Sequence, residues 1–309
     1  MVFFDLFAGI GGFRLPLERL GHTCRGFAEK DPHARATYKI NFDTGAEVEW
    51  HDITQITDRE IAEALEGIDL LTAGFPCQAF SVAGKGRGFD DARGTLFFDV
   101  ARIAEQVKPR YLLLENVKGL LFHNKGETFA RILSTLDELG YDAEWQLLNS
   151  ADFGIPQSRD RVFIIGHLRT EPFIRVFPIT RGNGTVVKQF RGAGNTDGVI
   201  PTAVAPVLTP GRKIKRQNGR RFKTFGEPMF TLTGQDIHGV VISNGVAVDI
   251  RRLTPLEYFR LQGFPDRFYY LATVAGVKKA QLYKQAGNAV TVPIVEAIAQ
   301  RLTRQEASQ

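Results

Sequence analysis

The chain contains little cysteine, and this scarcity limits the compartments in which it can work. Only Cys24 and Cys77 occur among its 309 residues. Two cysteines allow at most one disulfide, whereas small secreted domains depend on several. No apolar run approaches the roughly 18 residues that cross a membrane, and no basic residue precedes the apolar stretch at the amino end. We therefore expect a cytoplasmic protein without a signal peptide or a membrane helix.

The composition is that of an ordinary soluble globular protein, with 43% apolar and 24% charged residues. The net charge is +5, and it is unevenly distributed. Residues 181–251 hold eleven lysines and arginines against four acids, a local excess of seven positive charges. This segment is either a solvated basic face or a surface for a polyanion such as nucleic acid.

Alternating strand and helix patterns predict an α/β fold for the first half of the chain. Short apolar runs end near residues 7, 29, 52, 73 and 114, and helical patterns lie between them. Repeated β–α units form a doubly wound, mostly parallel sheet with helices on both faces. The runs 143–149 and 162–167 lie too close together for a crossover helix, so they predict an antiparallel hairpin.

The second half has a different character. From about residue 179, glycine, asparagine and basic residues dominate, and the strand patterns are short. We predict a smaller, mainly irregular and β domain over 179–281. A final helical pattern over 293–302 should pack back on the first domain, which then comprises 1–178 plus 282–309. Pro16 fits its predicted helix only if it lies in the first turn.

A glycine-rich loop, residues 7–12, follows the first predicted strand and opens a helix. Glycines let a ligand approach the backbone, and a helix start offers free N–H groups. Glu29 ends the next strand, where an acid in a nucleotide site bonds ribose hydroxyls. Asp52 ends the third strand, where it either accepts a bond from an adenine amine or caps a helix. The glycine spacing departs from the dinucleotide pattern, so simple strand–turn–helix packing is the alternative to nucleotide binding.

Residues 74–81, Gly-Phe-Pro-Cys-Gln-Ala-Phe-Ser, place Cys77 just beyond the apolar strand 69–73. Ligands bind at strand ends in open α/β sheets. The proline fixes the turn before Cys77, and Gly74 permits close approach of the backbone. A lone cysteine is more often buried and inert, so the interpretation depends on the groups around it.

Three charged groups accompany Cys77: the carboxylate of Glu115 and two guanidinium groups, Arg159 and Arg161. A free thiol is only slightly ionised at neutral pH, and a nearby arginine would favour the thiolate. Desolvation at a strand end would raise the pKa of Glu115, which could then donate a proton. Methylation of carbon-5 of cytosine needs these groups, because thiolate addition at carbon-6 and protonation of nitrogen-3 make carbon-5 nucleophilic.

The chain resembles the carbon-5 cytosine-specific DNA methyltransferases, in particular the small bacterial and phage modification enzymes, over nearly its whole length. The matching blocks are residues 5–12 (Asp-Leu-Phe-Ala-Gly-Ile-Gly-Gly), 74–78 (Gly-Phe-Pro-Cys-Gln), 115–117 (Glu-Asn-Val), 157–161 (Gln-Ser-Arg-Asp-Arg), 252–255 (Arg-Leu-Thr-Pro), 262–265 (Gln-Gly-Phe-Pro) and 285–288 (Gln-Ala-Gly-Asn). The Pro-Cys-Gln and Glu-Asn-Val pair in this order is highly specific. The resemblance implies a seven-stranded sheet domain, a small target-recognition domain and S-adenosylmethionine as the methyl donor.

The resemblance also implies roles for single residues. Cys77 is the nucleophile, Glu115 binds the cytosine edge, and Arg159 and Arg161 orient the base and the carboxylate. The positions that line the S-adenosylmethionine pocket are Phe7, Gly9, Gly11, Gly12, Glu29, Asp52, Ile53, Pro76, Leu96 and Asn288.

Two positions depart from the family pattern. Lys30 stands where some members have tryptophan against the adenine, so that face is covered differently here. His51 replaces a common glycine before Asp52. Neither change removes an essential group, and no metal ion is expected.

The implied partner is double-stranded DNA. A thiol cannot easily reach carbon-6 of a stacked cytosine, so the base must be flipped out, at a cost of about a few kcal/mol. DNA contacts are implied for Gln78, Arg93, Asn218, Arg221 and Thr231. Arg221 reads a guanine and Asn218 fills the vacated stack, or both simply contact phosphates. We also expect a monomer and, as a functional partner, a cognate restriction endonuclease.

Three other functions fit parts of the pattern. An RNA cytosine methyltransferase of the same fold would modify transfer RNA rather than duplex DNA. A catalytically silent DNA-binding module would leave the intact Cys77, Glu115 and Arg161 without a purpose. A nicotinamide oxidoreductase would use the glycine loop but would leave the Pro76-Cys77 pair unexplained.

Overall fold

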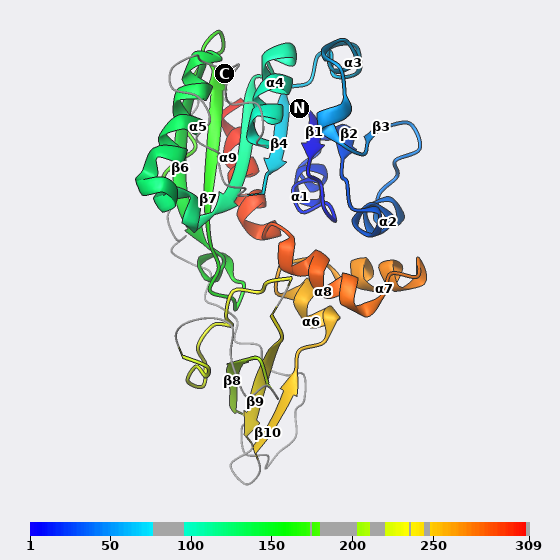
Figure 1. Ribbon diagram of the computed structural model, residues 1–309, viewed down its shortest axis with the longest axis vertical. Coiled ribbons are helices and arrows are strands. Elements are labelled where there is room, and N and C mark those ends of the chain that lie inside the picture. The colour runs from blue at the N-terminus through cyan, green and yellow to red at the C-terminus, as the bar shows by residue number, and fades with distance from the viewer. Residues whose placement is uncertain are drawn as a thin grey trace. The chain divides into compact units, whose positions relative to one another are not determined.

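The strands of the computed structural model form two sheets, one of seven strands and one of three (Figure 1). The structure describes residues 1–76, 96–173, 175–179, 203–210, 220–234, 236–243 and 248–306. Contacts group the chain into unit 1, which is Met1–Leu148, Asp160–Ile179 and Val290–Gln309, and unit 2, which is Asn149–Arg159 and Thr180–Ala289. Residues 149–159 and 282–289 thus group with unit 2, whereas the predicted bounds assigned them to the first domain. The roles predicted for the two domains stay predictions.

The seven-stranded sheet of unit 1 is mostly parallel, as predicted. Its strands are β1 (Val2–Leu6), β2 (Thr23–Ala28), β3 (Val48–Trp50), β4 (Leu70–Gly74), β5 (Tyr111–Val117), β6 (Tyr141–Asn149) and β7 (Asp160–Leu168). Their order is β3-β2-β1-β4-β5-β7-β6. Strands β1 to β5 pair in parallel, and β7 runs antiparallel to β5. The order reverses direction between β1 and β4, which is where open α/β sheets bind ligands.

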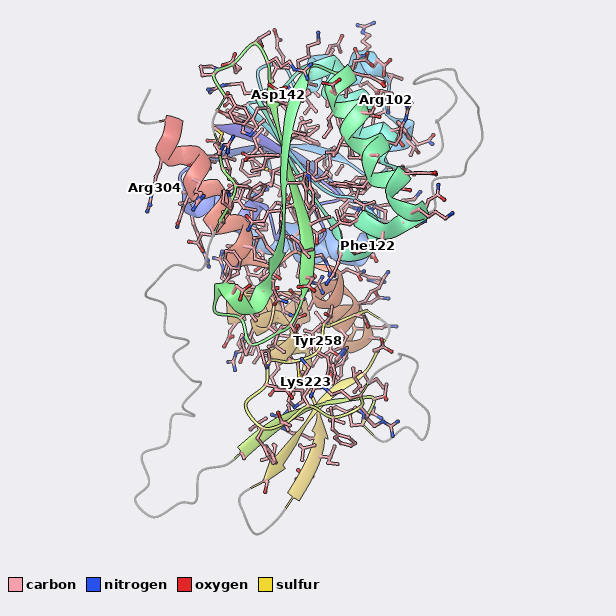
Figure 2. All side chains as sticks on the ribbon, turned by 90° about the vertical axis from the view of Figure 1, so that its left-hand side faces the viewer. Arg102, Phe122, Asp142, Lys223, Tyr258 and Arg304 are labelled. Atoms are coloured by element: carbon pink, nitrogen blue, oxygen red, sulfur yellow. The ribbon has the colours of Figure 1, made fainter. Side chains whose placement is uncertain are left out.

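Helices cover both faces of this sheet. The helical segments of unit 1 are α1 (Arg14–Arg19), α2 (Pro32–Asn41), η1 (Ile53–Gln55), α3 (Asp58–Ala64), α4 (Leu96–Val107), η3 (Lys118–Gly126), α5 (Glu127–Glu138) and α9 (Val292–Glu306). Helix α9 packs on α1, whereas α4 packs on α3 and α5. Arg102 of α4 and Arg304 of α9 lie on opposite sides of the sheet (Figure 2). The central strands are therefore buried on both faces, which explains their apolar sequences.

Local sequence signals account for several helix ends. Asp31 caps α2, where its carboxylate accepts bonds from the N–H groups of His33 and Ala34. Thr57 and Glu60 form the capping box that begins α3. Pro16 lies in the first turn of α1, where a proline disturbs no hydrogen bond.

Unit 2 contains the three-stranded sheet and a group of short helices. Its elements are η4 (Ser150–Phe153), β8 (Ala203–Leu208), β9 (His238–Ser243), β10 (Val248–Arg252), α6 (Pro255–Arg260), α7 (Asp266–Val274) and α8 (Lys279–Asn288). Strand β9 pairs antiparallel with both β8 and β10. A capping box of Thr254 and Glu257 begins α6, whereas no side-chain cap begins α7 or α8. In the part of the chain that the structure describes, no helix is both long and apolar enough to cross a membrane.

Asp5, the next-to-last residue of β1, carries a carboxyl group that is completely buried. Its Oδ1 accepts a hydrogen bond from the hydroxyl of Thr72, 2.8 Å away on β4. Burial raises the pKa of Asp5 from 3.8 to about 7, although the bond from Thr72 opposes the shift. The protonated form is therefore favoured in the folded state.

This shift predicts that unit 1 loses stability as the pH rises from about 4 to about 7. In that window the unfolded chain has already released the proton that folded Asp5 retains, so ionisation favours unfolding. The loss is at most about 4 kcal/mol, because each pKa unit corresponds to about 1.4 kcal/mol. Asp5→Asn should remove this part of the pH dependence. Denaturant unfolding at several pH values, followed by tryptophan fluorescence, measures it, since Trp50 and Trp145 both lie in unit 1.

Asp249→Asn is the matched control, because Asp249 is an exposed aspartate on a strand of unit 2. If wild type and Asp5→Asn lose stability equally over this pH range, the account of Asp5 is wrong.

Candidate active site

The carboxyl ends of five parallel strands bring most of the predicted site residues to one edge of the unit 1 sheet. Because β1, β2, β3, β4 and β5 run in the same direction, the residues that follow them meet at this edge (Figure 1). These residues are Phe7 and Gly9 after β1, Glu29 after β2, Asp52 after β3, Pro76 after β4, and Glu115 near the end of β5. The edge therefore joins the predicted cofactor residues to the predicted catalytic carboxylate.

The glycine loop after β1 is held in a tight, unusual conformation. Phe7 and Gly9 both have positive φ values, 54° and 57°, in the left-handed region that glycine adopts easily and phenylalanine does not. The backbone N–H of Gly9 donates to Glu29 Oε2 at 2.8 Å, and the N–H of Asp31 donates to Glu29 Oε1 at 2.7 Å. Burial raises the pKa of Glu29, and these two bonds oppose the rise. Glu29 thus links the first two strand ends.

The three predicted cofactor glycines differ in their surroundings. A Cβ added to Gly11 would lie 2.3 Å from a ring carbon of Phe42, and one added to Gly12 would lie 2.5 Å from Val290 Cγ1. A Cβ on Gly9 would meet only the Phe7 carbonyl oxygen, at 3.9 Å. Gly11 and Gly12 are therefore needed for packing within unit 1. Gly9 leaves open space in which a ligand can lie against the backbone.

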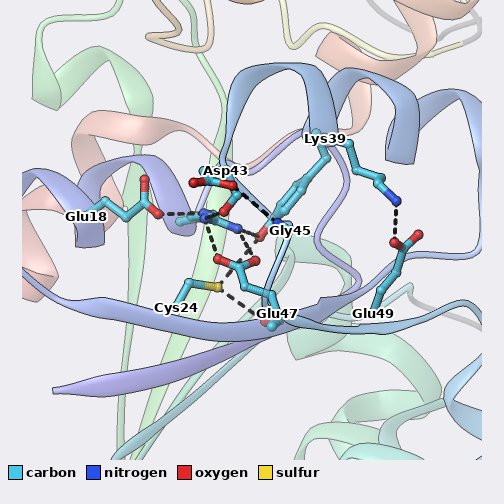
Figure 3. Close-up of polar contacts among 10 residues, drawn as sticks. Glu18, Cys24, Lys39, Asp43, Gly45, Glu47 and Glu49 are labelled. Atoms are coloured by element: carbon cyan, nitrogen blue, oxygen red, sulfur yellow. Dashed lines mark hydrogen bonds and ion pairs between the residues drawn. The ribbon is translucent and has the colours of Figure 1, made fainter.

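The buried Arg14 begins α1, directly after this loop. Its partners Glu18, Asp43 and Glu47 are labelled in Figure 3. Arg14 makes two hydrogen bonds of 2.7 Å to the carboxylate of Glu47, and it also bonds Glu18 and the carbonyl of Asp43. Its guanidinium lies 4.4 Å from the ring centroid of Phe42, the ring that faces Gly11. The loop therefore packs against a paired ionic and aromatic cluster, which was not predicted from the sequence.

Asp52 is fixed by two neighbours. Its Oδ1 accepts bonds from the backbone N–H and hydroxyl of Thr54, so that it caps η1, as one interpretation of the sequence suggested. Its Oδ2 lies 2.5 Å from Nζ of the exposed Lys30. The bond from Lys30 is the largest cause of the lowered pKa of Asp52. Lys30, which departs from the family pattern, thus forms an ion pair with Asp52 at the edge of the predicted cofactor pocket.

Ile53, the next predicted pocket residue, is buried, and its carbonyl accepts a 3.0 Å bond from Arg102 of α4. Arg102 also donates to the carbonyl of Ile56 and to Asp58. Sequence reasoning missed Arg102, because nothing in the helical pattern indicates that this side chain reaches back to carbonyls some 50 residues earlier.

The approach to Cys77 is anchored on β5. The side-chain amide of Asn116 donates to the carbonyl of Phe75 at 2.9 Å, and it is buried. This bond fixes the turn at Pro76, immediately before the cysteine. Cys77, Gln78 and Arg93 lie outside the described residues, and Leu96 is the first residue of α4. Asn116 matched the family motif, but its anchoring role was not predicted.

Glu115 forms a close ion pair with Arg161. The distance from Arg161 Nε to Glu115 Oε1 is 2.9 Å, and each side chain is only about an eighth exposed, at 13% and 12%. Arg161 on β7 is opposite Val117 of β5, so Glu115 is its diagonal neighbour on the same face. Glu115 is also paired with Gly74 across the β4–β5 ladder. One carboxylate, one guanidinium and the chain leading to Cys77 are therefore brought together.

Arg159 and Asn288 belong to the other unit. The guanidinium of Arg159 is buried and donates to the carbonyls of Leu232, Gly287 and Ala289, all within unit 2. Asn288 ends α8, and a Cβ on Gly234 would lie 3.2 Å from its Oδ1. The hydrogen bonds of the Arg159 guanidinium and the contact of Asn288 with Gly234 thus lie within unit 2.

Of the predicted DNA-reading residues, Arg221 and Thr231 are described in unit 2, whereas Asn218 lies outside the described residues. The hydroxyl of Thr231 donates to the carbonyl of Ser158 at 2.6 Å. The neighbouring basic side chains have different environments: Arg220 pairs with Glu227, and Lys223 lies 4.8 Å from the ring centroid of Phe230. Burial lowers the pKa of Lys223. Their roles in reading DNA stay predictions.

The fold and the strand-end carboxylates define a Rossmann-like methyltransferase architecture, and comparisons with known proteins identify the family. The family model described as C-5 cytosine-specific DNA methylase matches residues 1–191 and 179–304. The chain therefore belongs to this family. It is a DNA cytosine-5 methyltransferase, and its methyl donor is S-adenosylmethionine.

Individual relatives agree. The Type II methyltransferase M.NgoBI of Neisseria gonorrhoeae is 39% identical over 95% of this chain and 90% of the relative. M.HpaII of Haemophilus parainfluenzae is 38% identical over 97% and 88%. The orphan methyltransferase M.SPRI of Bacillus phage SPR is 30% identical over 96% of both chains. In structure, the S. pombe Dnmt2 methyltransferase has a TM-score of 0.67 at 20% identity over 99% of both chains, which supports the fold.

The surroundings of the three glycines predict different effects of adding a methyl group. Gly12→Ala should destabilise unit 1 by about 1–3 kcal/mol, because the new Cβ collides with Val290. Gly9→Ala should cost only about 1–2 kcal/mol for its positive φ, yet it should weaken S-adenosylhomocysteine binding about tenfold or more, since the methyl enters the open space predicted for the cofactor. Denaturant unfolding and calorimetric titration measure the two effects. Similar losses of affinity in the two variants, once corrected for unfolding, would contradict this distinction.

Proposed function

We propose that methyl transfer proceeds through a covalent bond between Cys77 and carbon-6 of a flipped-out cytosine in duplex DNA. The observation that carries this proposal is the arrangement at the end of β5. There Glu115 pairs with Arg161 at 2.9 Å, and Asn116 holds the turn one residue before the Pro76-Cys77 pair. A proton donor or acceptor is thus anchored beside the entry to the nucleophile, as addition to a pyrimidine requires.

Each residue has a defined chemical task in this proposal. The thiolate of Cys77 adds to carbon-6, and the carboxyl of Glu115 delivers a proton to ring nitrogen-3. The electrons of the ring would then make carbon-5 nucleophilic, so that it takes the methyl group from the sulfonium and leaves S-adenosylhomocysteine. Transfer of the carbon-5 proton to a water molecule and elimination of the Cys77 thiolate from carbon-6 restore aromaticity, and nitrogen-3 returns its proton to Glu115. Arg161 holds the carboxylate in place and stabilises its ionised form.

The residues at the strand ends suit the methyl donor, which supplies an electrophilic methyl group on sulfur. We assign the backbone contact to Gly9, where open space adjoins the loop. Glu29 and Asp52 offer carboxylate acceptors for ribose hydroxyls and an exocyclic amine. Phe7, Ile53, Pro76 and Leu96 would supply apolar walls, and Asn288 a polar contact. Gly11 and Gly12 would act indirectly, by letting Phe42 and Val290 pack on the loop.

We assign DNA reading to unit 2, with Arg221 on a guanine and Asn218, Thr231, Gln78 and Arg93 as further contacts. The basic excess over residues 181–251 supports this assignment, because phosphate neutralisation dominates DNA affinity. Bisulfite sequencing of DNA from cells that express the chain would identify the modified sequence. The chain is proposed to act as a monomer in the cytoplasm, associated with the nucleoid. Because both Type II and orphan methyltransferases match it, a cognate nuclease stays a prediction.

The two cysteines provide a direct test of the covalent step. Cys77→Ser should abolish methylation while leaving S-adenosylmethionine affinity within about twofold, because a serine hydroxyl is too weak a nucleophile without an activating base. Duplex DNA containing 5-fluorocytosine should form a denaturant-resistant adduct with the wild type but not with this variant. Transfer RNA serves as the comparison substrate for the RNA alternative.

Cys24→Ser is the matched control. Cys24 is partly buried on β2, and burial raises the pKa of its thiol to about 12, so it should not react. This variant should trap DNA like the wild type. Retained turnover in Cys77→Ser, or loss of trapping in Cys24→Ser alone, would refute the assignment of the nucleophile.

Adjacent arginines test DNA reading. Arg221→Ala should weaken binding to the modified sequence by about 1–3 kcal/mol and affect random duplex DNA much less, since a base contact carries sequence information. Arg220→Ala is the control, because Arg220 pairs with Glu227 and should affect both DNAs equally. Fluorescence anisotropy at fixed salt gives the four affinities. An equal loss on specific and random DNA for Arg221→Ala would refute base reading there.

A further inference from the structure

Arg159 occupies an unusual place in unit 2, where it holds two segments that are distant in sequence. Its Nη1 donates to the Leu232 carbonyl at 2.8 Å. Its Nη2 donates to the carbonyls of Gly287 and Ala289 at 3.1 and 2.9 Å. The side chain is only 1% exposed. Three carbonyls thus accept hydrogen bonds from a buried cation, and they belong to the 229–233 segment and to the end of α8.

Gln157, two residues earlier, holds the same assembly. Its side-chain oxygen accepts from the Leu232 N–H at 2.8 Å, and its side-chain nitrogen donates to the Leu261 carbonyl at 2.7 Å. The backbone adds two further bonds: Ser158 N–H donates to the Met229 carbonyl, and Met229 N–H donates to that of Pro156. We call Gln157 and Arg159, with the carbonyl and N–H groups they bind, the clamp. The hydrogen bonds of the clamp hold the 229–233 segment, α6 and α8 together.

The clamp lies at both points where the described chain leaves unit 2 for unit 1. The chain passes into unit 1 after Arg159 and again after Ala289. Arg159 therefore holds one crossing with its own backbone and the other through the Ala289 carbonyl. The bond between Arg159 and the Ala289 carbonyl therefore fixes the distance between the two points at which the chain leaves unit 2.

Each exit leads within two residues to a different part of the active site. Beyond the first exit, Arg161 pairs with Glu115 at 2.9 Å. Beyond the second, Val290 packs on Gly12 of the glycine loop, so closely that a Cβ on Gly12 would lie 2.5 Å from its Cγ1. One buried guanidinium is thus connected, through short stretches of chain, to the catalytic carboxylate and to the proposed cofactor loop.

We propose that Arg159 is a positioning residue that couples DNA binding to cofactor binding, and that it does not itself contact the base. The inference rests on the proposed function in assigning DNA reading to unit 2 and the cofactor to the glycine loop. DNA that binds the 229–233 segment shifts or stiffens the clamp, and the two exits carry this change to Arg161 and Val290. Coupling of two sites is a free energy, and it must appear equally in both directions.

The test measures the coupling factor, which is the ratio of S-adenosylhomocysteine dissociation constants without and with specific DNA. This product analogue needs no turnover, so a failure of the covalent mechanism leaves the measurement intact. We expect about fivefold or more tightening by DNA in the wild type. Arg159→Met keeps the length of the stem and removes all three bonds, and it should reduce the factor to less than about twofold. Its affinity for S-adenosylhomocysteine without DNA should stay within about twofold of wild type.

Two further variants keep the test decisive. Arg220→Met, an arginine of unit 2 outside the clamp, should keep the wild-type factor. Arg159→Lys retains one charged donor group and should give an intermediate factor; it replaces Arg159→Met if that variant does not fold. The proposal is overturned if the wild type shows no coupling, or if a folded Arg159 variant keeps the full factor. It is also overturned if Arg159→Lys loses cofactor affinity in the absence of DNA, or loses only specific DNA affinity, as a base contact would.

Discussion

The pairing of β5 with its two neighbours fixes the position of Glu115, and much of the site depends on that register. On one side, the parallel ladder with β4 places Gly74 opposite Glu115 and leads directly to the Pro76-Cys77 pair. On the other side, the antiparallel ladder with β7 brings Arg161 to the diagonal position. A slip of one residue in either ladder would turn a side chain to the opposite face of the sheet. The chemistry is therefore set by strand pairing before any side chain contributes.

Buried or partly buried arginines that bond to distant segments support this framework. Arg14 satisfies its donors on Glu18, Glu47 and a carbonyl behind the glycine loop. Arg159 and Arg102 instead bond backbone carbonyls, two or three each. A buried charge is costly unless it is paired and hydrogen-bonded, so each arginine constrains the segments around it. Every residue has a backbone carbonyl, so the sequence does not indicate which carbonyls accept these bonds.

Strand ends, capped helices and the main site carboxylates could be predicted because each has a local signal. Asp31 and Thr57 are capping residues of the kind that begin helices, and they begin α2 and α3. Glu29 lies at the edge of the sheet where nucleotide-binding acids are found. Helix α8 had no such signal, since Lys278 provides no side-chain cap and apolar residues are sparse along it. Nor could the sequence separate Arg159 from Arg161. The two arginines are two residues apart, so in an extended chain both would point to the same face. Only the β5–β7 register shows which of them reaches Glu115.

The Lys30–Asp52 pair has a consequence for the conditions in which the enzyme works. Lys30 is 79% exposed, and an exposed ion pair is screened progressively as ionic strength rises. Phosphate contacts of a basic surface weaken with the same variable. A change in the ion content of the cell would therefore weaken this ion pair and the phosphate contacts of a basic surface together, whereas an aromatic side chain at position 30 would respond little to salt.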